Sequence, residues 1–168
     1  MPATYDCIAT TTLSSATSSV TFSSISGSYT DLVLVFEGTS SAVDSLFARV
    51  NSDTASNYSG TELRGDGSTA ASSRFSNVTY LYLGYNVSMD STNRANAIIH
   101  FMNYSNSTTY KTVLSRFNRA GGSSYPGTAA YVNLWRSTSA ITSIQMIDYG
   151  GGNFSVGSTF TLYGITAA

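Results

Sequence analysis

The sequence predicts an all-β protein: a single-domain antiparallel β-sandwich over residues 1–168, jelly-roll-like, with about nine or ten strands. Short runs in which apolar and polar residues alternate follow one another along the chain. Turn-forming clusters separate these runs at intervals of roughly 10 residues, and no helical pattern or fixed-period repeat competes with them. One long connection, residues 52–73, suits a jelly roll better than an up-and-down barrel.

The first half of the chain contains four predicted strands. The strongest signal lies at residues 31–37, where five successive apolar residues predict a central strand covered on both faces. In the run at residues 18–25, Val20 and Phe22 alternate with polar residues, which predicts a half-buried strand. The predicted strands of this half are residues 4–9, 18–25, 31–37 and 45–51.

Polar and turn-forming residues dominate the next segment, residues 52–73. Gly60, Gly65 and Gly67 tolerate backbone conformations that other residues avoid, so we expect a long loop here. In a compact β domain, a connection of this length either contacts a partner or is a passive crossover. The sequence leaves both readings open.

The second half of the chain again alternates strands with turns. Residues 131–147 read as two strands joined by a tight turn at residues 136–140, and we expect them to form a β-meander with the closing strand at residues 158–165. The other predicted strands of this half are residues 78–85, 94–104 and 110–118, followed by a turn-forming break at residues 119–127.

The composition argues against several classes of partner. Charged residues make up 10% of the chain and the net charge is −1, with Lys111 as the single lysine, so we expect no nucleic-acid binding. We expect no signal peptide and no membrane span, because the N-terminus lacks a basic and apolar leader and no 18 apolar residues occur in succession. Ser and Thr form about a third of the chain, and strand edges lack the Lys and Glu that discourage pairing. This favours a protein that is built into an assembly.

No group of residues predicts catalysis or a cofactor, so we expect a non-enzymatic protein without cofactor or metal. Cys7, the only cysteine, reads as a small buried hydrophobic residue, and His100, the only histidine, as a packed strand residue. Asn51, Asp53 and Asp66 are candidate oxygen ligands for a loop calcium. The spacing of a calcium-binding loop is absent, and turn capping accounts better for these residues.

Tyrosines near loops are the candidates for contact with a partner or a glycan. Their rings can stack on a sugar or fill a pocket, but the same rings can bridge core and solvent, which is their more common role. Asp66 is a further candidate because of its place in the long loop. The candidate contact residues are Tyr58, Asp66, Tyr104, Tyr110 and Tyr125.

Six stretches along the whole chain carry a resemblance to a known family. They are Ala-Thr-Tyr-Asp at 3–6, Ser-Val-Thr-Phe-Ser-Ser-Ile at 19–25, Ser-Tyr-Thr-Asp-Leu-Val-Leu at 28–34, Asn-Ser-Asp-Thr-Ala-Ser-Asn-Tyr-Ser at 51–59, Leu-Trp-Arg-Ser-Thr-Ser-Ala-Ile-Thr-Ser-Ile at 134–144 and Phe-Thr-Leu-Tyr-Gly-Ile at 160–165. Together they resemble small virion structural proteins of tailed bacteriophages, especially marine and cyanobacterial phages. The resemblance implies a jelly-roll-like structural protein displayed on the particle and carries over no catalytic residue.

Within the virion, we expect a capsid decoration (cement) protein on the outer shell that contacts the major capsid protein or other virion proteins. A single compact domain suits this role, because a fibre normally needs a coiled coil or triple β-helix as well. On this reading the chain forms a homo-oligomer, most simply a trimer at local symmetry axes of the shell. The alternatives are a tail-fibre or receptor-binding module that contacts host surface glycans and, less favoured, a glycan-active enzyme.

Overall fold

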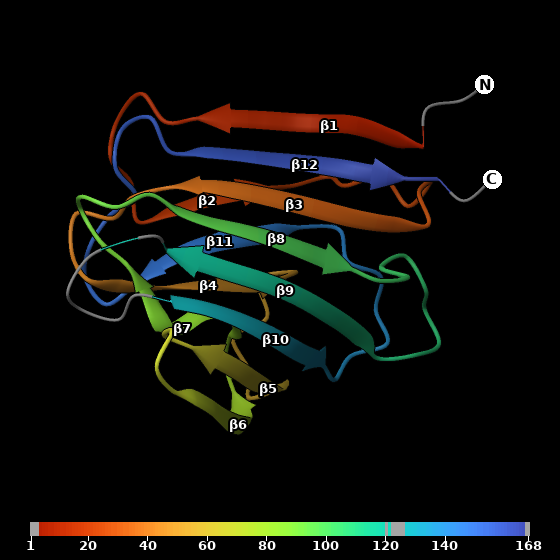
Figure 1. The fold of residues 1–168 in the computed structure, drawn as a ribbon. Coiled ribbons are helices and arrows are strands. Elements are labelled where there is room, and N and C mark those ends of the chain that lie inside the picture. Colours follow the sequence, from red (N-terminus) through yellow and green to blue (C-terminus); the bar gives the residue numbers. More distant parts are fainter. Residues whose placement is uncertain (1–3, 120, 122–126, 167–168) are drawn as a thin grey trace.

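The computed structural model describes residues 4–119, 121 and 127–166, and within these ranges it contains twelve strands and no helix (Figure 1). All strand pairs are antiparallel. The strands are β1 (Tyr5–Thr12), β2 (Ser19–Phe22), β3 (Asp31–Gly38), β4 (Asp44–Val50), β5 (Tyr58–Gly65), β6 (Ala70–Val78), β7 (Leu81–Met89), β8 (Ala95–Phe101), β9 (Lys111–Arg119), β10 (Gly127–Trp135), β11 (Ile144–Tyr149) and β12 (Thr159–Ile165).

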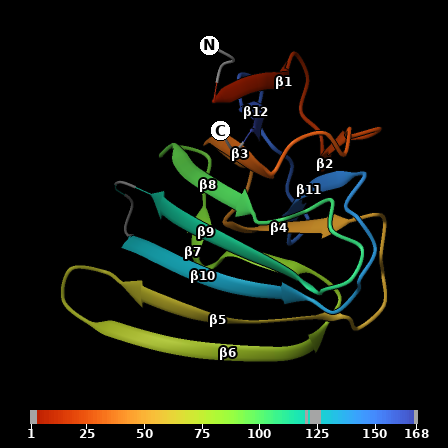
Figure 2. The same ribbon diagram turned by 90° about the vertical axis from the view of Figure 1, so that its right-hand side faces the viewer.

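The strands form two sheets. The larger has eight strands in the order β1-β12-β3-β8-β9-β10-β5-β6, and the smaller has four in the order β2-β11-β4-β7. Figure 2 shows the two layers, with β2, β11 and β4 beside the upper half of the larger sheet. One cluster of buried hydrophobic residues contains side chains from both sheets. The arrangement is consistent with a β-sandwich, as the alternating runs predict.

The period-two alternation explains which side chains enter the core. In β3, Leu32, Leu34 and Phe36 are completely buried, and they pair across the sheet with buried residues of β8 and β12. Val33 points to the opposite face yet is only 7% exposed, because Tyr163 and His100 flank it on the neighbouring strands. The predicted strand is confirmed and lies between two others, but cover on both faces holds only in part, because Glu37 on the outer face is exposed.

The prediction of a long loop at residues 52–73 is wrong. Most of it forms β5 and the first part of β6, a hairpin that extends the larger sheet and brings the described strands to twelve instead of nine or ten. Gly60 makes the hairpin possible, because a Cβ there would lie 2.8 Å from Asn133 Oδ1 on β10 and from the Phe75 ring on β6. The composition of β5 resembles that of a loop, because two of its packed positions hold a glycine, Gly60, and a buried carboxylate, Glu62, instead of apolar side chains.

The predicted C-terminal β-meander is also wrong, although its strands exist. β10 pairs with β9 and β5 in the larger sheet, β11 pairs with β2 and β4 in the smaller sheet, and β12 returns to the larger sheet between β1 and β3. The segment after β10 therefore crosses between sheets instead of making a tight turn. Asn51 holds this crossing, since its side chain accepts hydrogen bonds from the amides of Thr142 and Ser143 and donates one to the Ala140 carbonyl.

The two edges of the larger sheet differ. β1 forms one edge, carries a register shift between Cys7 and Ala9, and pairs Tyr5 with Ile165 of β12, so both ends of the chain leave from one corner (Figure 1). β6 forms the other edge and, among the described strands, pairs with β5 alone. Arg74 stands near the middle of this nine-residue edge strand.

Candidate functional site

The outer face of the larger sheet exposes several aliphatic side chains. Because side chains alternate along each strand, the residues between the core positions of β8, β9 and β10 point away from the smaller sheet. Ile98 is 42% exposed, Leu114 38% and Val132 52%, and Leu114 is the cross-strand partner of Val132. Leu63 on β5 adds a side chain that is 60% exposed. A contiguous aliphatic surface of this kind marks an interaction site in many soluble proteins.

A groove of about 900 Å³ lies on this face, across β8, β9, β10, β5 and β6. Its outward-pointing apolar side chains include Ile98, Leu63 and Ala130. The groove is bounded by polar residues toward the end of the sheet where β5 turns into β6. The full lining consists of Leu63, Arg64, Gly65, Ala70, Ala71, Ser72, Asn96, Ala97, Ile98, Arg116, Phe117, Asn118, Thr128, Ala129 and Ala130.

Four polar side chains of the groove are available to a ligand. The exposed Arg116 lies on β9 between Ile98 of β8 and Ala130 of β10, and Asn96, Asn118 and Thr128 form the next cross-strand row. Within the described ranges, no hydrogen bond or ion pair engages the side chains of these four residues. The described lining contains no carboxylate. The groove therefore combines an apolar floor with one unpaired positive charge and several neutral hydrogen-bonding groups.

Two of the predicted contact tyrosines do not lie on the surface. Tyr58 and Tyr104 are completely buried. The Tyr58 hydroxyl donates to the Asp53 carbonyl at 3.1 Å, and burial raises the pKa of its phenol. The Tyr104 hydroxyl donates to the Ser26 carbonyl. Both rings fill the ends of the core while their hydroxyls bind backbone groups, so neither is placed to stack on a partner.

The other three predicted contact residues lie apart. Tyr110 is 54% exposed just before β9, and it is absent from the groove lining. Asp66 directly follows Gly65 at the rim of the groove, where its carboxylate accepts hydrogen bonds from the amides of Ser68 and Thr69. These bonds hold the pKa of Asp66 well below its usual range. Tyr125 lies outside the described residues.

The candidate calcium ligands are not brought together. Asp53 accepts hydrogen bonds from the Trp135 indole at 2.7 Å and from Asn57, and Asn51 binds the crossing segment after β10. The full length of β5 separates Asp53 from Asp66. Each side chain caps a local turn or crossing, as the turn-capping reading predicts. Among the described residues, no three His, Cys, Asp or Glu side chains gather as a metal site would require.

The single cysteine and the single histidine occupy different environments from each other. Cys7 is exposed on the edge strand β1, so its prediction as a buried residue is wrong; the bulge at this edge leaves its side chain uncovered. His100 lies on β8 as predicted, partly buried, with its Nε2 3.1 Å from Asp31 Oδ2. The Asn103 amide donates to the other Asp31 oxygen at 2.6 Å.

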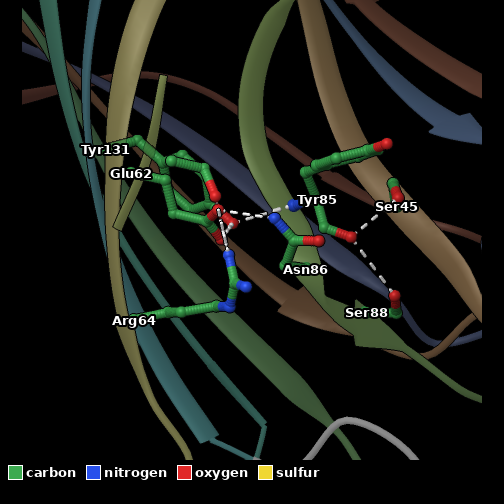
Figure 3. A network of polar contacts seen from close by, with 8 residues as sticks. Ser45, Glu62, Arg64, Tyr85, Asn86, Ser88 and Tyr131 are labelled. Carbon is green, nitrogen blue, oxygen red and sulfur yellow. Dashed lines mark hydrogen bonds and ion pairs between the residues drawn. The ribbon is translucent and has the colours of Figure 1, made fainter. Parts of the chain in front are cut away.

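A buried polar network joins β5, β10 and β7 on the core side of the larger sheet (Figure 3). The Glu62 carboxylate is completely buried and accepts hydrogen bonds from the Tyr131 hydroxyl at 2.9 Å, Asn86 Nδ2 at 2.5 Å and an Arg64 guanidinium nitrogen at 2.8 Å. The Tyr131 hydroxyl in turn accepts from the Tyr85 amide at 2.9 Å. Burial, and then the charge of Glu62, raise the pKa of Tyr131. The network holds β7 against the β5–β6 hairpin, and its Arg64 side chain, which is 31% exposed, reaches the lining of the groove.

A pair of buried acids lies where β4 begins and β11 ends. Asp44 and Asp148 are 6% and 4% exposed. Asp44 Oδ2 accepts a hydrogen bond from the Gly152 amide at 2.5 Å, and a Cβ on Gly150 or Gly152 would overlap the Asp44 carboxylate. Neither Asp148 oxygen has a well-aligned donor in the described part of the chain; the Ser40 hydroxyl and the Asp44 carboxyl are its polar neighbours. Burial, together with the charge of Asp44, raises the pKa of Asp148 to about 7.

Aromatic rings form a stack over the outer face of the smaller sheet. Phe47 lies between Tyr82, with ring centroids 4.4 Å apart, and Tyr149, at 4.7 Å, and Tyr82 stacks further on Phe75 of β6 at 4.2 Å. The alternation of Tyr80 and Tyr82 in the sequence is the signal that could have identified this cluster. The rings cover one another's faces and close the seam between β7 and β6, while Tyr85 and Tyr149 at the margin of the stack each remain 46% exposed.

The sequence analysis did not identify the groove, since its residues come from five strands. The described residues include no helix long and apolar enough to cross a membrane. In the comparison with known proteins, no family model, curated protein or solved structure matches the chain.

Proposed function

We propose that this chain is a non-enzymatic structural protein of a bacteriophage virion, a capsid decoration protein that docks on the shell through the outer face of its larger sheet. The observation that carries the proposal is the aliphatic surface of Ile98, Leu114, Val132 and Leu63, exposed on a rigid sheet. Removing such a surface from water stabilises a complex by about 25 cal/mol per Å² of apolar area. The family resemblance of the sequence supplies the virion as the setting.

We also propose that the fold is a jelly roll enlarged by two hairpins. The order β1-β12-β3-β8 faces β2-β11-β4-β7, so β1 pairs with β12, β2 with β11, β3 with β8 and β4 with β7. This is the pairing expected when one long antiparallel hairpin rolls into two sheets. The hairpins β5–β6 and β9–β10 then add four strands to one sheet and provide most of the groove.

In the assembled particle, the major capsid protein or another virion protein is the proposed partner, and a homotrimer at local symmetry axes is the proposed state. A symmetric oligomer would present the aliphatic face several times to the repeating shell, so that weak contacts add up. The stack around Phe47, with Tyr85 and Tyr149 each 46% exposed, would then face away from the shell.

The copy number of the chain per purified particle tests the proposal. Quantitative mass spectrometry, normalised to the major capsid protein, should find hundreds of copies if the chain decorates the shell. A few copies to a few tens would instead favour a tail or vertex module that contacts host glycans. Absence of the chain from purified particles would overturn both virion roles and would favour an enzymatic role instead.

Substitution of Val132 tests whether the aliphatic face makes the contact. We expect Val132→Glu to release the protein from particles at least about tenfold more readily, because binding would bury the new carboxylate. Val132 is already 52% exposed, so the melting temperature should change little. Val156→Glu is the matched control, because Val156 is 62% exposed outside the larger sheet. Equal retention of both variants would exclude this face as the contact.

A further inference from the structure

We propose that the groove binds an extended peptide segment of a partner protein in which an acidic side chain lies between apolar ones, with Arg116 as the contact for the carboxylate. This inference rests on the proposed function, because it assumes that the partner is a protein. It goes further by naming the chemistry of the segment and the residue that selects it.

The charge of the groove favours an acidic ligand. Arg116 is exposed, has no acceptor among the described residues, and stands between the apolar cross-strand neighbours Ile98 and Ala130. A ligand that covers these neighbours must also desolvate the guanidinium, which is unfavourable unless the ligand brings an anion. Arginine suits this task because its planar fork binds a carboxylate through two parallel hydrogen bonds.

The floor of the groove favours apolar side chains beside the acid. Leu63 and Ile98 are 60% and 42% exposed, and both point into the groove. Five neighbouring strands about 4.8 Å apart span about 19 Å, the length of about six extended residues. Asn96, Asn118 and Thr128 line one side of this path and supply donors and acceptors for the backbone of an extended segment.

A saccharide fits the same groove less well. Pyranose rings are held by stacking on aromatic faces, and the aromatic residue of the described lining, Phe117, is 2% exposed with its ring in contact range of Gly84 on the core side. The apolar side chains that remain would lie against sugar hydroxyls without a hydrogen-bond partner. A nucleic acid needs several phosphate contacts, and the groove offers two guanidinium-bearing residues, of which Arg64 already pairs with Glu62.

Fluorescence anisotropy with defined probes tests the inference on the purified full chain. The first probe is a labelled peptide with the pattern Leu-Ser-Asp-Ser-Leu, in which the leucines and the aspartate share one face when the chain is extended. The second replaces aspartate with lysine, and the third is a labelled oligogalacturonate. We expect the aspartate peptide to bind most tightly. Arg116→Glu should weaken it at least about tenfold and strengthen the lysine peptide, because the substitution reverses the charge of the groove.

Arg74→Glu is the matched control. Arg74 is exposed on the same face of the sheet, on β6 opposite Thr61, and does not line the groove. This variant should bind the aspartate peptide within about twofold of the parent chain, since solvent-exposed charges at a distance contribute little. Both variants should melt within a few degrees of the parent, which excludes unfolding as the cause of lost binding.

Three outcomes would overturn the inference. They are tighter binding of the oligogalacturonate than of the aspartate peptide, equal weakening by Arg116→Glu and Arg74→Glu, and no binding of any peptide. These results leave the copy number per particle untouched, so failure of the groove chemistry is distinguishable from failure of the virion role.

Discussion

Asp148→Asn will stabilise the protein above neutral pH and leave it nearly unchanged in acid. In the parent chain Asp148 is buried beside Asp44, and its pKa is raised to about 7. The unfolded chain loses this proton near pH 3.8, whereas the folded chain retains it until about pH 7. The stability linked to this group is therefore fully present at lower pH and is lost as the pH rises through about 7. An asparagine in place of Asp148 mimics the protonated acid and removes the loss.

Thermal melts of the two proteins between about pH 4 and about pH 8.5 measure the effect, which should reach a few kcal/mol at the alkaline end. Asp53, Asp66 and Asp90 have lowered pKa values, so they change the stability of both proteins at the acid end of the range. Their contributions cancel when the two proteins are compared. Glu37→Gln, with its carboxylate 51% exposed, is the control and should shift neither curve. A parent chain whose stability does not decline over this range would contradict the assignment.

Glu62→Ala will have the largest effect on stability of any single carboxylate substitution in the described chain. It leaves the Tyr131 hydroxyl, the Asn86 amide and the Arg64 guanidinium without their shared acceptor, in a region where Glu62 itself is completely buried. Breaking a buried charged pair in this way costs about 3–5 kcal/mol. Urea unfolding of the variant should show this decrease in the free energy of unfolding.

The matched control is Glu37→Ala. Glu37 also pairs with an arginine, at 2.7 Å from Arg94, but the side chains are 51% and 46% exposed. An exposed pair contributes about 0–1 kcal/mol, so the control should unfold within that margin of the parent. Similar losses in both variants would mean that the buried network contributes no more than a surface ion pair.

Local alternation predicted the strands whose partners are apolar. The runs that became β4 and β8 carry their core residues at every second position, and the run that became β3 is continuously apolar, so both patterns are visible without knowledge of any neighbour. β5 could not be recognised in this way. Its inward positions hold Gly60 and Glu62, and both are favourable only because Phe75, Asn133, Tyr131 and Asn86 arrive from other strands.

Strand pairing and the groove could not be predicted from the sequence for the same reason. β10 and β11 alternate as expected, yet nothing in their residues states that Asn51 will hold the segment between them so that it crosses to the other sheet. Tyr58 and Tyr104 looked like loop tyrosines because nothing in the sequence around them shows that their hydroxyls will bind the carbonyls of Asp53, five residues away, and of Ser26, 78 residues away. The groove forms only when five strands lie side by side in one order, so no single stretch of the sequence predicts it.

The pairing of Tyr5 with Ile165 places the start of β1 and the end of β12 side by side, at the edge of the larger sheet opposite β6. Cargo fused beyond either strand would leave from the β1–β12 corner, whereas the groove begins at β8 and extends toward β6 at the opposite edge. A fluorescent protein or antigen attached there would lie away from the proposed docking face. Because Tyr5 and Ile165 are neighbours, a short linker could join β12 to β1, and new termini could be made at the Asp66 turn. Cargo fused at these new termini would lie beside the groove and block access to it.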